Sequence, residues 1–159
     1  MNSDGNKTSV LMICLGNICR SPLAEAALRA AAEQDGLDVM VDSAGTGDWH
    51  IGHPPDARAI QAAKLYGGLN IGNLRARQVT VEDFDRFDHV VALDIANLRD
   101  LRAMQPSGSK ARLSLLLDHL PGHEGQSVAD PYYGDDAGFE TCWLEVSAAA
   151  QSLLRMLKP

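Results

Sequence analysis

Short apolar runs alternate with longer segments of helical pattern along the chain. Four runs have the length and the β-branched content of strands: residues 10–13, 37–41, 89–93 and 113–117. Helices are predicted at residues 22–35, 56–66 and 94–105 and in a final stretch. There an apolar stripe recurs at spacings of three and four: Phe139, Trp143, Val146, Ala150, Leu153 and Leu157. The alternation predicts an α/β fold, a four-stranded parallel sheet flanked by helices on both faces in a flavodoxin-like three-layer sandwich, with function at the carboxyl ends of the strands.

The first predicted helix has residues typical of a helix start. Ser21 is the expected N-cap and Pro22 the first helical residue. Glu25, Arg29 and Glu33 lie four apart and are expected to form a solvated face. The opposite, alanine-rich side is therefore expected to cover the sheet.

The loop between the first strand and the first helix contains the candidate chemistry. Cys14 opens this loop and Arg20 closes it, with five residues between them, and Gly16 lets the backbone approach a ligand without a side-chain clash. Backbone N–H groups that point inward and a helix N-terminus together form an anion site. The same donors would favour the Cys14 thiolate, which is a nucleophile, and Arg20 could fork across two phosphate oxygens.

These residues favour phosphoryl transfer to sulfur over nucleotide binding. The Lys-Ser/Thr pair of a triphosphate-binding loop is absent, so triphosphate and magnesium binding do not fit. The alternative is a plain strand-to-helix turn that carries a buried cysteine and a surface arginine.

Residues 14–22 resemble the signature loop of the low-molecular-weight protein tyrosine phosphatases. The resemblance continues at residues 23–25, 41–44, 52–56, 76–78, 97–101 and 130–134. The last of these segments, Asp-Pro-Tyr-Tyr-Gly, makes the match specific. The resemblance implies the phosphotyrosine phosphatase I-like fold of this family. It also implies hydrolysis of phosphotyrosine in proteins through a phosphocysteine intermediate, with Cys14 as nucleophile and Arg20 as phosphate clamp.

Asp130 is the expected general acid and base. A carboxylic acid that protonates the departing phenolate eases its expulsion, and the carboxylate can then take a proton from water. Asp130 lies in a segment without predicted secondary structure, residues 119–138, and long loops in compact domains are usually functional. The alternative is an Asx-type turn before Pro131.

The remaining site residues are expected around Cys14. The phosphate-binding loop comprises Leu15, Gly16, Asn17, Ile18, Cys19 and Ser21. Asn17 would fix the loop through hydrogen bonds to neighbouring backbone, and the resemblance implies that the Ser21 hydroxyl stabilises the sulfur when the intermediate breaks down.

Aromatic side chains are expected to form the walls of a deep slot for a phenyl ring. These walls are Trp49, Tyr132 and Tyr133. Ser43 and Asp94 are expected to support the site. Asp94 could pair with Arg20, or it could only cap the following helix.

Cys19 is expected to protect Cys14, because a second thiol on the loop can trap oxidised Cys14 as a reversible disulfide. A zinc site would need two further ligands, and only His50 and His53 are near, with poor spacing. No metal ion and no cofactor is expected. Many members of the resembled family carry a histidine where this chain has Leu74, which leaves the effect on the second step open.

Two related activities and one non-enzymatic role compete with this prediction. Related protein-arginine phosphatases carry a threonine where Ile18 stands, and the apolar Ile18 favours an aryl ring. Arsenate reductases of similar loop need further cysteines, and none lies between Gly36 and Thr141. A phosphate-binding module without catalysis would lack Cys14 or Asp130, and this chain has both.

Length and charge limit the partners. The 159 residues are expected to form one domain, with a flexible N-terminus at residues 1–7. A formal net charge of −7 argues against nucleic acid and anionic membranes, and no apolar run approaches the ~20 residues of a membrane span. Three cysteines cannot all pair, which favours the reducing cytoplasm. The expected partners are tyrosine-phosphorylated proteins, a cognate tyrosine kinase among them, bound by a monomer or weak dimer.

Overall fold

The computed structural model describes residues 7–158, which contain a four-stranded sheet. Its strands are β1 (Thr8–Cys14), β2 (Val39–Gly45), β3 (His89–Ala92) and β4 (Arg112–Leu115). The helices are α2 (Arg20–Gln34), α3 (Ala57–Gly67), α4 (Asp83–Arg86), α5 (Ile95–Met104), α6 (Asp136–Leu157) and the 3₁₀ helix η1 (Leu116–His119). The strand pairs are parallel, in the order β2-β1-β3-β4, which confirms the predicted parallel sheet.

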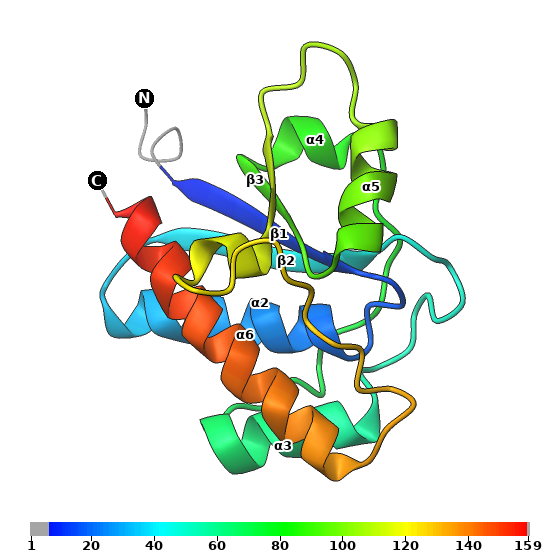
Figure 1. Ribbon diagram of the computed structural model, residues 1–159, viewed down its shortest axis with the longest axis vertical. Helices are drawn as coiled ribbons and strands as arrows, with labels where there is room; N and C mark the ends of the chain where they lie inside the picture. The colour runs from blue at the N-terminus through cyan, green and yellow to red at the C-terminus, as the bar shows by residue number, and fades with distance from the viewer. Residues whose placement is uncertain (1–6, 159) are drawn as a thin grey trace.

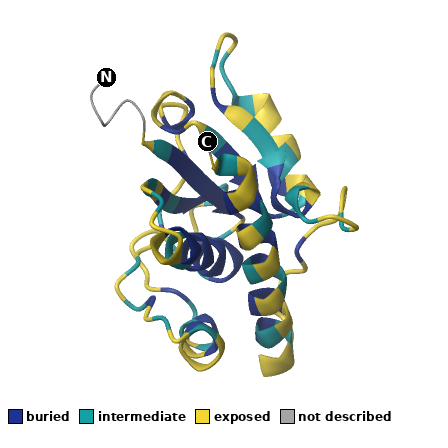
Figure 2. Cartoon of the chain, turned by 90° about the vertical axis from the view of Figure 1, so that its left-hand side faces the viewer, coloured by how far each residue is buried: buried dark blue, intermediate teal, exposed yellow. Residues whose placement is uncertain are grey.

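The central strand β1 separates two apolar cores. Val10 and Met12 belong to the core with α2, α3 and α6, whereas Leu11 and Ile13 belong to the core with α4 and α5. All four side chains are fully buried, and β1 is the dark strand in the middle of Figure 2. Figure 1 shows α2 and α6 packed together on one side of the sheet, with α4 and α5 across the sheet from them. Helices therefore cover both faces, as the predicted three-layer α/β fold requires.

The order of the strands places a crevice at the carboxyl end of β1. This strand lies between β2 and β3, and ligands of open α/β sheets bind where the strand order reverses in this way. Cys14 is the last residue of β1 and pairs with Gly45, the last residue of β2. A Cβ atom on Gly45 would lie 2.6 Å from the Leu15 carbonyl oxygen, so only glycine lets the two chains approach this closely. The loop that starts at Cys14 opens into this crevice.

The start of α2 differs from the sequence prediction. The helix begins at Arg20, and its N-cap residue, Cys19, makes no side-chain capping bond. The prediction that Ser21 is the N-cap is wrong, because Ser21 lies inside the helix and its hydroxyl faces the Cys14 sulfur. Pro22 is accordingly the third helical residue.

The predicted solvated face of α2 is also wrong at Glu25. Glu25 is only 2% exposed, whereas Glu33 is exposed. The strand predicted at residues 37–41 instead spans Val39–Gly45, so Ser43 lies in the strand and faces Glu25. Packing of β2 against α2 therefore buries a carboxylate that local spacing assigned to solvent.

The end of β4 differs from the sequence prediction, and most of the predicted flexible N-terminus lies outside the described residues. The predicted strand at residues 113–117 ends at Leu115, and η1 follows it. The predicted flexible N-terminus, residues 1–7, lies outside the described residues except for Lys7, whose ammonium is 3.2 Å from an Asp38 carboxylate oxygen. Over residues 7–158, the structure contains no helix with both the length and the apolar character to cross a membrane.

Candidate active site

The Cys14 loop (residues 14–20) joins β1 to α2 and holds a buried sulfur. Cys14 Sγ lies 3.0 Å from the Ser21 hydroxyl oxygen and accepts a hydrogen bond from the Ser21 N–H at 3.4 Å. Asn17 has a φ of 58°, in the left-handed region that asparagine adopts more readily than most residues. A bent loop of this kind needs side-chain hydrogen bonds to keep its shape.

The Asn17 side chain supplies three such bonds. Its Nδ2 donates to the hydroxyl oxygens of Ser21 at 2.8 Å and Ser43 at 2.9 Å, and its Oδ1 accepts from the Arg77 N–H at 3.0 Å. The backbone partner is thus distant in sequence, where a neighbouring one was expected. Leu74, at the position of the expected histidine, packs against the hydrophobic core instead. Ser21 receives its hydrogen bond from Asn17.

A buried carboxylate ends this chain of hydrogen bonds. The Ser43 hydroxyl donates to Glu25 Oε1 at 2.6 Å, and Arg29 Nη2 donates to Glu25 Oε2 at 2.6 Å. Burial raises the pKa of Glu25, while the hydrogen bonds from Ser43 and Arg29 oppose that rise. The sequence contained no local sign of this role, because the Ser43 partner comes from another element.

The Arg20 guanidinium is buried and is held by two acceptors. Its Nη1 donates to Asp94 Oδ2 at 2.7 Å and to the Val128 carbonyl at 3.0 Å. Burial alone would lower the pKa of Arg20, but the Cys14 sulfur and Asp94 raise it above its ordinary value, so the guanidinium stays charged. Asp94 also accepts from the Asn97 N–H and caps α5. Both expected contacts of Asp94 are present.

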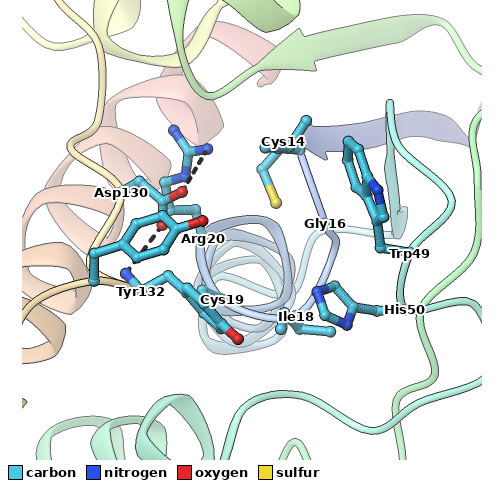
Figure 3. A pocket seen from close by; sticks show the side chains of 11 residues that line it. Cys14, Gly16, Ile18, Cys19, Arg20, Trp49, His50, Asp130 and Tyr132 are labelled. Carbon is cyan, nitrogen blue, oxygen red and sulfur yellow. Dashed lines mark hydrogen bonds and ion pairs between the residues drawn. The ribbon is translucent and has the colours of Figure 1, made fainter.

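A cavity of about 350 Å³ lies above this loop. It is lined by Cys14, Leu15, Gly16, Ile18, Cys19, Arg20, Trp49, His50, Asp130, Tyr132 and Tyr133. Figure 3 shows the Cys14 sulfur pointing between two walls, one with Arg20 and Asp130 and one with Trp49. The structure therefore gathers the predicted catalytic and wall residues in one cavity, while Asn17, Ser21, Ser43 and Asp94 support it from outside the lining.

Asp130 stands at the wall with Arg20. Its Oδ2 is 3.6 Å from Arg20 Nη2, and its Oδ1 accepts a hydrogen bond from the Tyr132 N–H at 3.1 Å. The second contact, two residues apart, is an Asx turn. Asp130 therefore forms the Asx turn that was offered as the alternative, and it also lies beside the Cys14 loop. The two explanations do not exclude each other. The Asp130 side chain is 35% exposed, so an entering substrate can reach it.

The aromatic walls are unequal. Tyr133 is 89% exposed and packs edge-on against Tyr132, with ring centroids 5.0 Å apart. Trp49 is also largely exposed, and a side chain at Gly47 would collide with its ring. Tyr132 and Trp49 thus form the opposing rims of the cavity, and Tyr133 lines its exposed edge beside Tyr132.

His50 lines the cavity and was missed as a pocket residue. Its ring centroid is 6.4 Å from that of Tyr132, and a Cβ atom on Gly16 would lie 3.0 Å from its Cδ2 atom. Figure 3 shows the imidazole beside Gly16 and Ile18. Its place next to Trp49 in the sequence was the one available signal, and the sequence offered it only as a weak candidate for a zinc ligand.

All three cysteines are free and buried. Burial, and after it the nearby Asp56 carboxylate, raises the pKa of Cys19 well above its ordinary value, and burial raises the pKa of Cys142 to about 12. Both are therefore neutral thiols near pH 7. Within the part of the chain that the structure describes, no three His, Cys, Asp or Glu side chains are grouped so that they could hold a metal ion.

Comparison with known proteins agrees with this geometry. The family model described as low molecular weight phosphotyrosine protein phosphatase matches residues 9–159. The chain belongs to this family. A low molecular weight phosphotyrosine protein phosphatase from Schizosaccharomyces pombe is 39% identical over 151 residues, which cover 93% of this chain and 96% of the relative. Membership identifies the chain as a hydrolase of the phosphotyrosine protein phosphatase type.

Solved structures of low-molecular-weight phosphatases and their relatives share the fold. YfkJ from Bacillus subtilis superposes with a TM-score of 0.86 and 38% identity, covering 95% of this chain and 94% of that one. A Drosophila arginine phosphatase superposes with a TM-score of 0.87 and 32% identity, covering 94% of this chain and 98% of that one. The fold alone therefore does not decide between these two kinds of substrate.

Proposed function

We propose that this chain hydrolyses phosphotyrosine in proteins through a phosphocysteine intermediate on Cys14. One observation supports this above the others. A single cavity gathers a buried thiol, a charged guanidinium and an accessible carboxylate beneath an aromatic rim. Family membership supports the same class of reaction. The proposed steps need neither a cofactor nor a metal ion.

In the first step, the Cys14 thiolate attacks phosphorus. The S–P bond forms while the bond from phosphorus to the phenol oxygen breaks, and Asp130 gives its proton to that oxygen. Arg20 Nη1 is occupied by Asp94 and Val128, which leaves Nε and Nη2 to fork across two phosphate oxygens. The dephosphorylated tyrosine then leaves with its hydroxyl restored.

In the second step, water attacks the phosphocysteine. The Asp130 carboxylate takes a proton from this water while the S–P bond breaks, and inorganic phosphate is released. The sulfur departs as a thiolate, and the Ser21 hydroxyl and N–H, at 3.0 Å and 3.4 Å, stabilise its charge. The enzyme returns to its starting state.

The cavity walls favour an aromatic ring over an aliphatic chain. A phenyl ring can lie between Trp49 and Tyr132 while its phosphate reaches Cys14. Ile18 adds an apolar contact in the same cavity. Protein-arginine phosphatase is the second candidate, supported by the similarity to the Drosophila enzyme. Arsenate reductase is a weaker alternative, because Cys142 is the one cysteine outside the Cys14 loop.

We place the reaction in the cytoplasm, where reducing conditions keep Cys14 and Cys19 as thiols. The proposed partners are tyrosine-phosphorylated proteins, a tyrosine kinase among them, and the proposed working form is a monomer or weak dimer. Capture from a lysate on a Cys14→Ser variant would identify these partners, and Cys14→Ser with Arg20→Lys is the matched control with a weakened phosphate site.

Initial rates with three substrates test the proposed function. Matched peptides that carry phosphotyrosine or phosphoarginine, and arsenate with a thiol reductant, would be compared in the presence of a metal chelator. We expect turnover to be fastest with the phosphotyrosine peptide and absent in Cys14→Ala. Faster turnover of the phosphoarginine peptide would replace this proposal with the second candidate, and activity that Cys14→Ala retains would overturn the mechanism.

A further inference from the structure

Arg58 lies outside the cavity but connects two parts of the active site. It lies in the first turn of α3, two residues after Asp56, the N-cap residue of that helix. The Asp56 N–H donates to the Ile18 carbonyl at 2.8 Å, so the start of α3 is attached to the Cys14 loop. Figure 1 shows that α3 also lies beside the start of α6, where the segment with Asp130 ends.

The Asp56 carboxylate fixes the Arg58 guanidinium in one orientation. Asp56 Oδ1 accepts from Arg58 Nε and Asp56 Oδ2 accepts from Arg58 Nη2, both at 3.0 Å. Oδ1 also accepts from the Arg58 N–H at 2.8 Å. These hydrogen bonds from Arg58 lower the pKa of Asp56, so the ion pair persists into mildly acidic solution.

The other side of the same guanidinium holds the acid segment (residues 130–134). Arg58 Nη2 donates to the Tyr132 carbonyl at 3.0 Å, and Nη1 donates to the Gly134 carbonyl at 3.1 Å. The guanidinium carbon also lies 4.6 Å from the ring centroid of Phe139, at the start of α6, and 5.6 Å from that of Tyr132. Among the described residues, Arg58 makes the only hydrogen bonds that reach residues 131–134 from another part of the chain.

Tyr132 passes this constraint to Asp130. Its carbonyl accepts from Arg58, while its N–H donates to Asp130 Oδ1. The position of the Asp130 carboxylate therefore depends on a peptide that Arg58 anchors. Arg58 is in turn held by Asp56, and Asp56 is hydrogen-bonded to Ile18 in the Cys14 loop. These contacts connect the acid segment to the loop that holds the nucleophile.

We propose that Arg58 is a positioning residue, which holds the acid segment at a fixed distance from the Cys14 loop so that Asp130 reaches the oxygen of the leaving group. This inference rests on the proposed function, because it assigns Asp130 the role of general acid. Arg58 touches neither the sulfur nor the substrate phosphate in this scheme. Because Arg58 also anchors Tyr132, its loss should affect ring binding alike for any aryl ester, whereas the loss of proton transfer matters only when the leaving group needs a proton.

The test is the dependence of kcat/KM on the leaving group, because kcat/KM reports formation of the phosphocysteine. With phenyl phosphate, Arg58→Ala should lower kcat/KM by roughly 10- to 100-fold, the scale of a misplaced catalytic group. With a dinitrophenyl phosphate, whose phenol is strongly acidic, the loss should be much smaller. Arg58→Lys should keep most of the defect, because an ammonium cannot form the planar fork.

Two variants control for charge and folding. Arg75→Ala removes an exposed arginine whose side chain, within residues 7–158, donates only to the Gly72 and Leu74 carbonyls, and it should leave both rates unchanged. Asp56→Asn keeps an oxygen that can cap α3 but weakens the fork on Arg58, and it should give a smaller, leaving-group-dependent loss. It also tests the proposal if Arg58→Ala fails to fold.

A double variant separates positioning from general loss of structure. In an Asp130→Asn background, Arg58→Ala should cause almost no further loss with phenyl phosphate, since both act on one proton. Equal losses with both esters, or additive losses in the double variant, would overturn the positioning role. If the wild type does not turn over aryl phosphates, or Asp130→Asn shows no leaving-group dependence, the proposed function itself fails.

Discussion

At the scale of single residues, the Asn17 amide determines the direction of the hydrogen bonds around the Cys14 sulfur. Asn17 gives one amide proton to each of Ser21 and Ser43, and Ser43 gives its own proton to Glu25. The Ser21 hydroxyl proton is then left to point at the sulfur. A sulfur that must carry negative charge twice in each turnover, as nucleophile and as leaving group, therefore faces a donor whose orientation is already fixed.

Ser21→Ala should slow breakdown of the intermediate more than its formation. A hydrogen bond to a charged group contributes about 1.5–3 kcal/mol, so the second step should fall by roughly 10- to 100-fold. The first step should suffer less, because the starting thiolate loses the same bond and becomes more nucleophilic. Rapid-quench kinetics should show a larger burst of phenol release, and equal slowing of both steps would contradict this role.

Cys19 should protect Cys14 against peroxide. Peroxide converts the Cys14 thiolate to a sulfenic acid, and the Cys19 sulfur then displaces hydroxide to form a disulfide. Because the attacking species is the thiolate and burial raises the pKa of Cys19, this closure should accelerate as pH increases. Dithiothreitol should restore activity to the oxidised wild type but far less to Cys19→Ser. Cys142→Ser, which removes another buried thiol, should recover like the wild type, and equal recovery of all three proteins would rule out the protection.

At the scale of elements, Glu25 joins α2 to β2 beneath the active site. Its spacing to Arg29 and Glu33 predicted a solvated face, but Glu25 is buried and pairs with Arg29 at 2.6 Å. The sequence could not show that Ser43 would cover the carboxylate, because that depends on β2 packing against α2. The same limit applies to Arg58, whose partners at residues 132 and 134 are 74 and 76 positions away. Local patterns predicted the candidate catalytic and binding residues. Long-range contacts decide which of these residues act together.

The Glu25 carboxyl should make stability depend on pH. Burial raises the pKa of this carboxyl above its value in the unfolded chain, which is near 4.3. Its contribution to the free energy of unfolding is therefore fully present below the unfolded pKa and is lost as pH rises through the folded pKa. The wild type should therefore lose stability relative to Glu25→Gln as pH rises from about 4, near the unfolded pKa, through the raised folded pKa. Urea unfolding at a series of pH values measures this difference. Glu33→Gln, on the exposed face of the same helix, is the control, and a difference for Glu25→Gln that stays constant with pH would contradict the argument.

At the scale of the whole molecule, the predictable part is the layered fold and the position of the Cys14 loop. Both follow from hydrophobic periodicity, because β1 must be apolar on both faces and the loop after it must open at the edge of the sheet. The candidate acid could be named from the segment at residues 130–134 by its resemblance to the family. The distance between Asp130 and Arg20 could not be predicted from the sequence. Residues 119–135 have little regular structure, and separate tertiary contacts, such as that of Val128 with Arg20, fix their position.

Phosphate should stabilise this protein through the Cys14 loop alone. The chain has a formal net charge of −7, so a bound anion is held by local donors against the field of the whole molecule. At a free phosphate concentration about 100 times its Kd, the wild type and Cys14→Ser should each gain about 2.7 kcal/mol, or roughly 5–11 °C in Tm.

Arg20→Lys supplies the control for this measurement, because phosphate also stabilises proteins as an excluded salt. A lysine at this position cannot keep the contacts with Asp94 and Val128 and also fork across two phosphate oxygens. Its Tm should therefore rise only by the unspecific amount, relative to its own value without phosphate. If the three proteins gained equally, the anion would be bound elsewhere or not at all, and the assignment of Arg20 as the phosphate clamp would be wrong.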